Sequence, residues 1–396
     1  MNRFQFPSLD RQMLIPKAVY FCFFAAVASL GPFLVLYYEQ TGLTGWQIGL
    51  LTGLFPLLTL ISSPLFGAVA DVTQQHDRLL KLAIVATLAS VVFLLLAGSF
   101  LGLLIVVIIY ALAFAPIQPL IDKTVLDLLG ERKADYGRHR LWGSVGWGLA
   151  APLVGGLADQ WGLAWSFYGF LAFMSLTLLT TFGLQVQPVK LETQVWRGMA
   201  SLLTDWRWFS FLVILFTSGM GLAILHNYLF LYLAELGASR TLMGFALTIA
   251  TVSEMVVMFF AAALLRQWGT KGVLALSAAI LAVRLLAYSV IDLTWLVLLL
   301  QLSHGPTFAA MWVASVARAD ELAPPGMGAT AQGLQTSISM GIGSACGAFL
   351  GGILYEWGGV DLMFRGAGVG VLLGLGLFVI TERWLNKPKP LPEAGV

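Results

Sequence analysis

The sequence predicts an all-α integral membrane protein with twelve spanning helices in two similar halves. Its 396 residues are 59% apolar and only 11% charged, and their mean hydropathy is +0.86. A soluble domain carries about 25% charged residues, so this composition excludes a soluble enzyme. It also excludes a disordered chain, which needs few apolar residues and a high net charge. Apolar segments long enough to cross a bilayer recur along the whole chain, without the alternation that β-strands would require.

Twelve mostly apolar segments, each of about 20 residues or more, lie between clusters of Gly, Pro and charged residues. The predicted spans are 14–38, 46–70, 79–98, 101–129, 140–161, 163–186, 207–235, 241–266, 271–292, 294–318, 328–356 and 360–385. A polar stretch, 187–206, separates the sixth span from the seventh. We therefore expect an N-terminal half at 1–186, a cytoplasmic linker at 187–206 and a C-terminal half at 207–396.

The basic residues predict the orientation of the chain. With the N-terminus in the cytoplasm, all 22 Lys and Arg residues except Arg240, Arg284 and Arg365 fall on the cytoplasmic side. The positive-inside rule then places both termini in the cytoplasm of a multi-pass protein of the cell inner membrane. The net charge is only +2 and no long basic run occurs, which argues against a nucleic-acid partner.

Two pairs of matching segments indicate an internal repeat. Residues 155–162 read GGLADQWG and residues 351–358 read GGILYEWG, while Ile-Gly-Leu at 48–50 is matched by Met-Gly-Phe at 243–245. Both pairs are separated by about half of the chain. Parallel repeats of this kind are typical of secondary transporters, which hold their solute near the middle of the membrane between the halves.

A short motif lies between the second and third predicted spans. Gly67 and Asp71 are followed by the basic residues Arg78 and Lys81. A small residue allows a neighbouring helix to approach, and a carboxylate can face a helix N-terminus. The segment resembles the loop signature of the major facilitator superfamily, which implies that Asp71 latches the two halves together. An ordinary polar loop is the alternative interpretation.

The fifth span opens with the stretch YGRHRLWGSVGW at 136–147. Arg140, Ser144 and Trp147 share one helix face because of their spacing. The stretch resembles the same segment in the lactose permease group of oligosaccharide and phenylpropionate proton symporters. That resemblance implies that Arg140 binds solute through hydrogen bonds and Trp147 by stacking. The alternatives are a membrane-edge anchor for Arg140 and simple packing for Trp147.

The fourth span carries Gln118, Asp122 and Lys123. The resemblance places Gln118 where the group has a solute-binding glutamate. An amide can bond to hydroxyl groups but carries no charge, which argues against lactose-like galactosides and leaves other small organic solutes open. Asp122 is either a functional acid or half of a structural pair with Lys123 or another basic neighbour, and we favour the structural pair.

Three ionisable residues fall inside predicted spans, namely Glu254, Arg284 and His304. Such groups are tolerated at this depth chiefly when they pair or line a cavity. In the lactose permease group the matching residues couple protons to solute, which implies that role here. The group's principal proton-carrying glutamate falls on Thr307, which cannot carry a proton, and a group lysine falls on Gln301. Glu254 is then the expected proton carrier with His304 as its partner, and a structural Glu254–Arg284 pair is the alternative.

The seventh span contains one polar run, 226–228, in which Asn227 is the preferred solute contact and helix packing is the alternative. Together the motifs predict a monomeric, proton-coupled symporter that moves a sugar, nucleoside or aromatic acid by alternating access. The competing hypotheses are a proton-driven exporter of amphipathic compounds and a receptor or scaffold that has lost transport. No constellation typical of an enzyme, a cofactor site or a metal site occurs at membrane depth.

Overall fold

The computed structural model describes residues 11–73, 75–130, 135–184, 205–324 and 327–385, and these residues are almost entirely helical. The helices of the first part of the chain are α1 (Arg11–Leu30), η1 (Gly31–Phe33), α2 (Leu34–Gln40), α3 (Gly45–Thr73), α4 (His76–Leu96), α5 (Phe100–Phe114), α6 (Ile117–Leu129), α7 (Tyr136–Trp161) and α8 (Ala164–Thr181). Those of the second part are α10 (Trp206–Glu235), α11 (Arg240–Tyr288), α12 (Thr294–Leu300), η3 (Gln301–Ser303), η4 (Gly305–Ala309), α13 (Ala310–Leu322), α14 (Gly328–Thr336), η5 (Ser337–Gly343) and α15 (Ser344–Leu385). Most of the predicted linker, 187–204, lies outside the described residues.

Every predicted span coincides with helical structure, and ten stretches of the described chain are long and apolar enough to cross a membrane. Two of these stretches are 49 and 55 residues long, more than twice the roughly 20 residues that one crossing needs. The first is α11, which is interrupted at Gly269; the second includes α15, which is interrupted at Gly358 and Gly359. Gly269 and Gly359 have positive φ angles of 65° and 66°, a conformation that favours glycine.

Helix boundaries follow local sequence signals. The Ser239 side chain caps α11 by accepting a hydrogen bond from the Leu242 N–H at 3.2 Å, and Asp205 caps α10 in the same way through Arg207. The predicted span 101–129 is divided between α5 and α6 at Pro116, since proline lacks the N–H that would continue the helical ladder.

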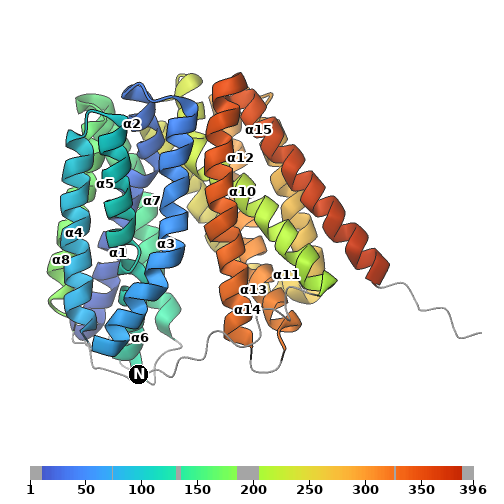
Figure 1. Cartoon of the computed structure of the whole chain (residues 1–396), viewed down its shortest axis with the longest axis horizontal. Helices are drawn as coiled ribbons and strands as arrows, with labels where there is room; N and C mark the ends of the chain where they lie inside the picture. Colours follow the sequence, from blue (N-terminus) through green and yellow to red (C-terminus); the bar gives the residue numbers. More distant parts are fainter. Residues whose placement is uncertain (1–10, 74, 131–134, 185–204, 325–326, 386–396) are drawn as a thin grey trace, which may run out of the picture.

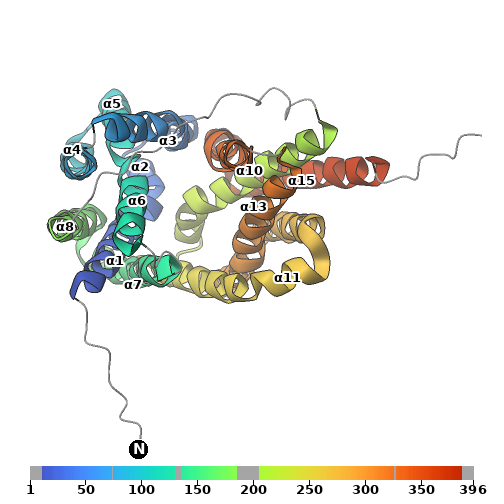
Figure 2. The same ribbon diagram turned by 90° about the horizontal axis from the view of Figure 1, so that it is seen from below.

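The helices form two groups that lie side by side (Figures 1 and 2). We call α1–α8 the N-terminal group and α10–α15 the C-terminal group. In the first, α1 packs against α7 and α8; in the second, α10 packs along α15, where the buried Tyr228 hydroxyl donates to the Ala348 carbonyl at 2.8 Å. A continuous set of buried apolar side chains fills the space between helices.

Across the groups α10 contacts α2 and η1, and the two most extensive contacts join α3 with α15 and α7 with α11. Both contacts depend on glycine. A Cβ atom built on Gly49 of α3 would lie 2.7 Å from the Phe349 carbonyl oxygen, and one built on Gly155 of α7 would overlap the Arg240 carbonyl oxygen. These backbones can approach so closely only because the side chains are absent. We call the end of the bundle at which α3 and α11 begin the closed end.

The C-terminal group contains a buried network of ion pairs. Arg318 on α13 donates to Glu382 on α15 at 2.8 Å and to Glu321 at 3.1 Å. Lys271, just after the Gly269 break in α11, also pairs with Glu382. The side chains of Arg318 and Glu382 are only 7% and 9% exposed. The network therefore ties three helices together at one place.

Large apolar side chains cover the outside of the bundle. Phe259, Trp357 and Leu96 are 81%, 76% and 72% exposed, and many other Leu, Val and Phe side chains are similarly placed. A soluble monomer rarely exposes such an extensive apolar surface, whereas a bilayer requires one. The exterior agrees with the composition in indicating an integral membrane protein.

Candidate functional site

Arg140 lies in the first turns of α7, in the N-terminal group, and aromatic rings hold its position. Its guanidinium carbon is 3.9 Å from the centre of the Phe24 ring and 5.7 Å from that of Tyr20, both on α1. Cation–π contacts orient the guanidinium without occupying its N–H donors. Among the described residues Arg140 forms no ion pair within 4 Å, so its fork of donors remains available to a ligand.

Trp147, about two turns further along α7, contacts the opposite group. Its ring stacks on the His226 imidazole of α10, with 6.1 Å between ring centres and planes 26° apart. His226 is exposed, although it lies within an apolar helix between two strongly buried neighbours, Leu225 and Tyr228. An imidazole in the middle of a spanning helix is tolerated chiefly where polar groups pair or line a cavity, and here it meets Trp147 of the opposite group.

Glu254 lies on α11 and is half-buried. The Arg140 guanidinium of α7 attracts the Glu254 carboxylate across the groups, although the two form no ion pair within 4 Å. No ion pair joins Glu254 to Arg284, although both side chains are described. The structural Glu254–Arg284 pair that the sequence left open as an alternative is therefore not formed in this structure.

Arg284 is 2% exposed and forms the centre of a hydrogen-bond network. Its guanidinium donates to Gln301 at 2.8 Å and to Thr307 and Tyr288 at 3.2 Å each, and it lies 3.4 Å from Nδ1 of His304. Gln301 in turn donates to the Tyr288 hydroxyl at 2.9 Å. Three helical segments, α11, η3 and η4, thus converge on one buried cation whose described partners are all neutral or imidazole groups.

Asn227 and Gln118, the remaining candidates for solute contact, make simpler contacts. The Asn227 amide donates to the Ala223 carbonyl of its own helix at 2.8 Å, which leaves its oxygen available. Gln118 is half-buried on α6, and its side chain forms no hydrogen bond with another described residue. Neither observation assigns a role, so solute binding by these two amides remains a prediction.

Asp122 on α6 is not paired with Lys123. It accepts a 2.6 Å hydrogen bond from the Tyr20 hydroxyl of α1, while Lys123 forms an ion pair with Asp127 at 3.1 Å. Asp122 therefore helps to fix the aromatic residues that support Arg140. Gly67 and Asp71 fall within α3, but their side chains lie outside the described residues, so the proposed latch stays a prediction.

Two contacts of the site were not assigned from the sequence. His226 was visible there only as part of the polar run 226–228, and its pairing with Trp147 depends on how α7 and α10 face each other. Its interaction with His304, which lies close enough for an electrostatic effect, likewise joins two helices that are far apart in the chain. Within the described part of the chain, no group of three or more His, Cys, Asp or Glu side chains could hold a metal ion.

The fold and this polar site between two helix groups define the class of protein: a membrane transporter of small solutes. Residues 13–366 match the model of the MFS_1 like family, so the chain belongs to that family of the major facilitator superfamily and is not an enzyme. This agreement confirms the resemblance seen in the loop and fifth-span motifs.

Individual relatives agree with the family. The chain is 31% identical to a maltose permease of Geobacillus stearothermophilus over 98% of this chain and 99% of that protein. It is 25% identical to a probable 3-phenylpropionic acid transporter of Escherichia coli, covering 94% and 97%. The crystal structure of the nucleoside transporter NupG superposes with a TM-score of 0.83 at 18% identity, covering 95% of this chain and all of that one.

Proposed function

We propose that this protein is a proton-coupled symporter of a small organic solute, acting as a monomer in the cell inner membrane by alternating access. On this proposal α11 and α15 each cross the membrane twice, turning at Gly269 and at Gly358 and Gly359, which makes twelve crossings in all. The N-terminal and C-terminal groups are then the halves 1–186 and 207–396, which rock about the site between them.

The distribution of basic residues supports an orientation for this conformation. The closed end contains Arg240, one of the few basic residues expected on the outer side, while the Arg318 and Lys271 network belongs to the cytoplasmic side. The site is therefore closed towards the outside and faces the cytoplasm. Release of solute into the cell is the step that this conformation serves.

The solute is proposed to bind between the halves, where Arg140, Trp147 and His226 lie. The Trp147 and His226 rings supply flat apolar faces, and the Arg140 fork supplies paired donors suited to two hydroxyls or one carboxylate. Gln118 and Asn227 add amide groups of the kind that bond to hydroxyls. A ring-shaped solute with several polar substituents fits this combination.

The placement of Glu254 opposite Arg140 is the observation that carries the coupling proposal. A solute that bonds to Arg140 takes the guanidinium away from Glu254, and an isolated carboxylate in an apolar span is favoured in its neutral form. Glu254 then accepts a proton as solute binds, and both cross together. The neutral hydrogen-bonding partners of Arg284 keep that cation in place throughout, with His304 and Thr307 beside it.

The relatives favour a sugar as the solute. The maltose permease matches nearly the whole chain, while the phenylpropionic acid and nucleoside transporters share ring-containing cargo according to their names. Sugars, nucleosides and aromatic acids all present a ring with polar groups at its edge. We therefore rank sugars first and retain the other two as members of the test panel.

The proposal is tested with full-length protein in proteoliposomes, using radiolabelled maltose, uridine and 3-phenylpropionate, each with and without an imposed pH gradient. The wild type should accumulate one of them above equilibrium only when the gradient is present. Glu254→Gln should lose at least tenfold of this accumulation, while exchange of solute at equal concentrations continues because exchange needs no net proton movement.

Asp292→Asn provides the matched control, since Asp292 is an exposed carboxylate in the turn between α11 and α12. It should accumulate solute as the wild type does. Undiminished gradient-driven accumulation by Glu254→Gln would contradict the coupling assignment. Solute movement into the proton-rich compartment, in exchange for protons that leave it, would instead support the exporter hypothesis.

A further inference from the structure

Ser253 of α11 bridges the backbone of a neighbouring helix. Its hydroxyl donates a hydrogen bond to the Leu302 carbonyl and accepts one from the Gly305 N–H at 3.1 Å. A hydroxyl can donate and accept at once, so this single side chain satisfies two backbone groups of the tenth predicted span. We call this pair of hydrogen bonds the Ser253 bridge.

The bridge lies where the hydrogen-bond ladder of that span is interrupted. Pro306 has no N–H, so the Leu302 carbonyl, four residues earlier, lacks the partner that a regular α-helix would provide. The backbone passes here from the short turn η3 to the π-helical segment η4. An unsatisfied carbonyl is costly in a membrane, and a serine on a neighbouring helix is one of the groups that can satisfy it. The Ser253 hydroxyl therefore replaces the missing backbone donor.

The two helices can meet at this point because Gly305 has no side chain. A Cβ atom built on Gly305 would overlap the Ser253 carbonyl oxygen and would lie 2.8 Å from the Ser253 hydroxyl. Ser253 itself is only 8% exposed. The close approach that the bridge needs thus depends on glycine at this position.

Ser253 is also the last buried residue of α11 before the break at Gly269. The stretch 243–250 contains four buried residues, whereas none of residues 254–269 is buried. Glu254, the expected proton carrier, is the first residue beyond the buried part of the helix. Its position therefore depends on the contact that the residue before it makes.

On its other side the bridge adjoins the Arg284 network. Gly305 directly follows His304, whose Nδ1 lies 3.4 Å from the Arg284 guanidinium. Thr307, two residues further on, accepts a hydrogen bond from the same guanidinium at 3.2 Å. The bridge thus connects the helix of Glu254 to the segment that surrounds the buried cation.

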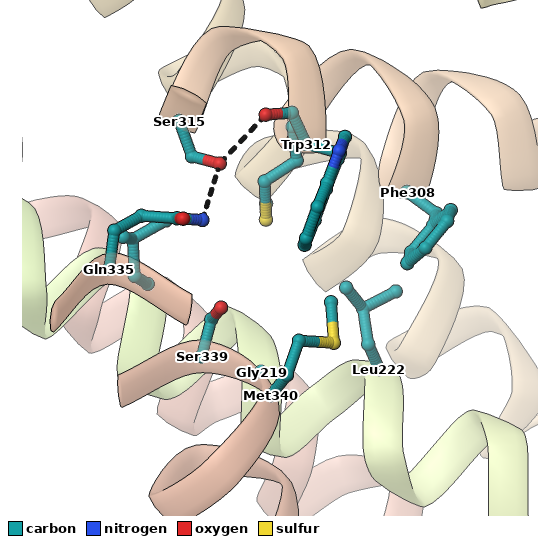
Figure 3. Close-up of a pocket in the computed structure, with 10 residues that line it drawn as sticks. Gly219, Leu222, Phe308, Trp312, Ser315, Gln335, Ser339 and Met340 are labelled. Atoms are coloured by element: carbon teal, nitrogen blue, oxygen red, sulfur yellow. Dashed lines mark hydrogen bonds between the residues drawn. The ribbon is translucent and has the colours of Figure 1, made fainter. Parts of the chain in front are cut away.

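Another face of the tenth span is packed less tightly. Figure 3 shows Phe308 of η4 and Trp312 of α13 beside a cavity that Leu222 of α10 and Met340 of η5 also line. Its volume is about 20 Å³, room for about one water molecule, and none of its lining residues belongs to α11. Because this face leaves space beside η4, the position of η4 depends more strongly on the Ser253 bridge.

We propose that Ser253 is a positioning residue for proton coupling, because its bridge holds Glu254 at a fixed place opposite Arg140. The inference rests on the proposed function, in which solute bound to Arg140 changes the surroundings of Glu254. Without the bridge, η4 and the part of α11 beyond Ser253 move independently, so solute binding no longer determines whether Glu254 is protonated. The solute contacts of the N-terminal group do not involve Ser253 and are retained.

The bridge itself is tested by deuterium uptake of the full-length purified protein, followed by mass spectrometry. Ser253→Ala should speed deuterium uptake in a peptide covering residues 301–309 by about tenfold or more, because two backbone groups lose their partner. Ser253→Thr keeps the hydroxyl and should keep most of the protection. Thr251→Ala is the matched control, since the Thr251 hydroxyl donates at 2.9 Å to the Leu247 carbonyl of its own helix, and it should match the wild type.

The positioning role is tested in proteoliposomes with radiolabelled maltose, uridine or 3-phenylpropionate, whichever the wild type accumulates. The measured quantity is the ratio of gradient-driven accumulation to solute exchange at equal concentrations. Ser253→Ala should lower this ratio by about fivefold or more, while the half-saturating concentration for solute exchange stays within about twofold. A purely structural defect lowers both activities together and leaves the ratio unchanged. Ser253→Thr should restore the ratio, and Thr251→Ala should not alter it.

Ser253→Cys serves where the alanine variant unfolds, because a thiol has a similar shape but is a weak donor. Unchanged deuterium uptake at 301–309 would overturn the bridge, and an unchanged ratio would overturn the positioning role even where deuterium uptake rises. Accumulation of none of the three solutes by the wild type would contradict the proposed function. The positioning role would then fall with it, while deuterium uptake would still decide whether the bridge holds the two helices together.

Discussion

The Asp159 carboxylate near the end of α7 binds the first turn of α11 through Thr241. It accepts the Thr241 N–H at 2.9 Å and the Thr241 hydroxyl at 2.6 Å, and it also accepts the Arg240 N–H at 2.8 Å. An acidic group at a helix N-terminus satisfies donors that the helix leaves free and interacts favourably with the helix dipole. Here the acid and the helix belong to different groups.

A second contact repeats this arrangement on the other helix pair. Glu356 of α15 accepts the backbone N–H of Trp46, at the start of α3, at 2.8 Å. Asp159 and Glu356 each lie in one of the two GGxxxxWG segments, 155–162 and 351–358. The helix starts that they cap come just before the other pair of repeated segments, 48–50 and 243–245. The closed end is thus held by two related carboxylate caps.

Asp159→Asn should weaken the closed end. The amide keeps an acceptor but loses the charge, and for so exposed a group the loss is about 1 kcal/mol, or about a fivefold change in population. The distance between spin labels at the exposed positions 161 and 357 should show an increased fraction of separated conformations. Asp135→Asn, which affects only an exposed pair with Arg138 inside one group, should leave the distribution unchanged. An unchanged distribution in Asp159→Asn would contradict a latch role.

Gly155→Ala should prevent full closure, because the added methyl group would overlap the Arg240 carbonyl oxygen. Overpacking of this kind costs about 1–3 kcal/mol, so solute uptake in proteoliposomes should fall about tenfold or more. The neighbouring Gly156→Ala is the control, since its Cβ would lie 3.5 Å from the Thr241 hydroxyl and fits without movement. Equal uptake by the two variants would show that the close approach is not required.

Arg284→Lys should destabilise the protein although it keeps the positive charge. A lysine ammonium cannot reach Gln301, Thr307 and Tyr288 in the planar geometry that the guanidinium provides. The loss of charge-assisted hydrogen bonds should lower the free energy of unfolding by about 2–3 kcal/mol in a detergent denaturation titration. Arg365→Lys, at an exposed position with one long contact of 3.5 Å to Ser289, should change it by less than about 0.5 kcal/mol. Similar values for both would refute the structural importance of the Arg284 network.

Glu382→Gln should destabilise the C-terminal group, because it leaves the buried Arg318 with only the half-exposed Glu321 as a charge partner. Breaking a buried pair costs about 3–5 kcal/mol, whereas an exposed pair contributes at most about 1 kcal/mol. Asp77→Asn is the comparison, since its pair with Lys81 has side chains 40% and 24% exposed. Both variants are measured in the same unfolding titration, and a smaller loss for Glu382→Gln than for Asp77→Asn would be inconsistent with the burial of the network.

The spans were predictable because a bilayer imposes length and apolarity on each helix independently of its neighbours. The breaks at Pro116 and Gly269 also follow from local backbone chemistry. Contacts between helices are different: the stacking of Trp147 on His226, and the electrostatic influence of Arg140 on Glu254, depend on helix rotation and position. Those quantities are set by packing over the whole bundle, so the sequence could only leave a Glu254–Arg284 pair open as an alternative.

The stacking of His304, Phe308 and Trp312 lies between these two cases. Their spacing of four residues predicts a shared helix face, and the three rings stack in that order. The residues that this face meets were not predictable, since Ser339 and Met340 come from a π-helical segment whose geometry no local pattern announced.

The buried charge of Arg284 has a consequence for the cargo of the proposed transporter. Its charge is permanent at any physiological pH and is balanced by no carboxylate among its described partners. In a poorly polarisable interior this charge acts over several ångströms and raises the energy of any second cation brought near it. On the proposed function we therefore expect neutral and anionic solutes to be carried in preference to organic amines and quaternary ammonium compounds.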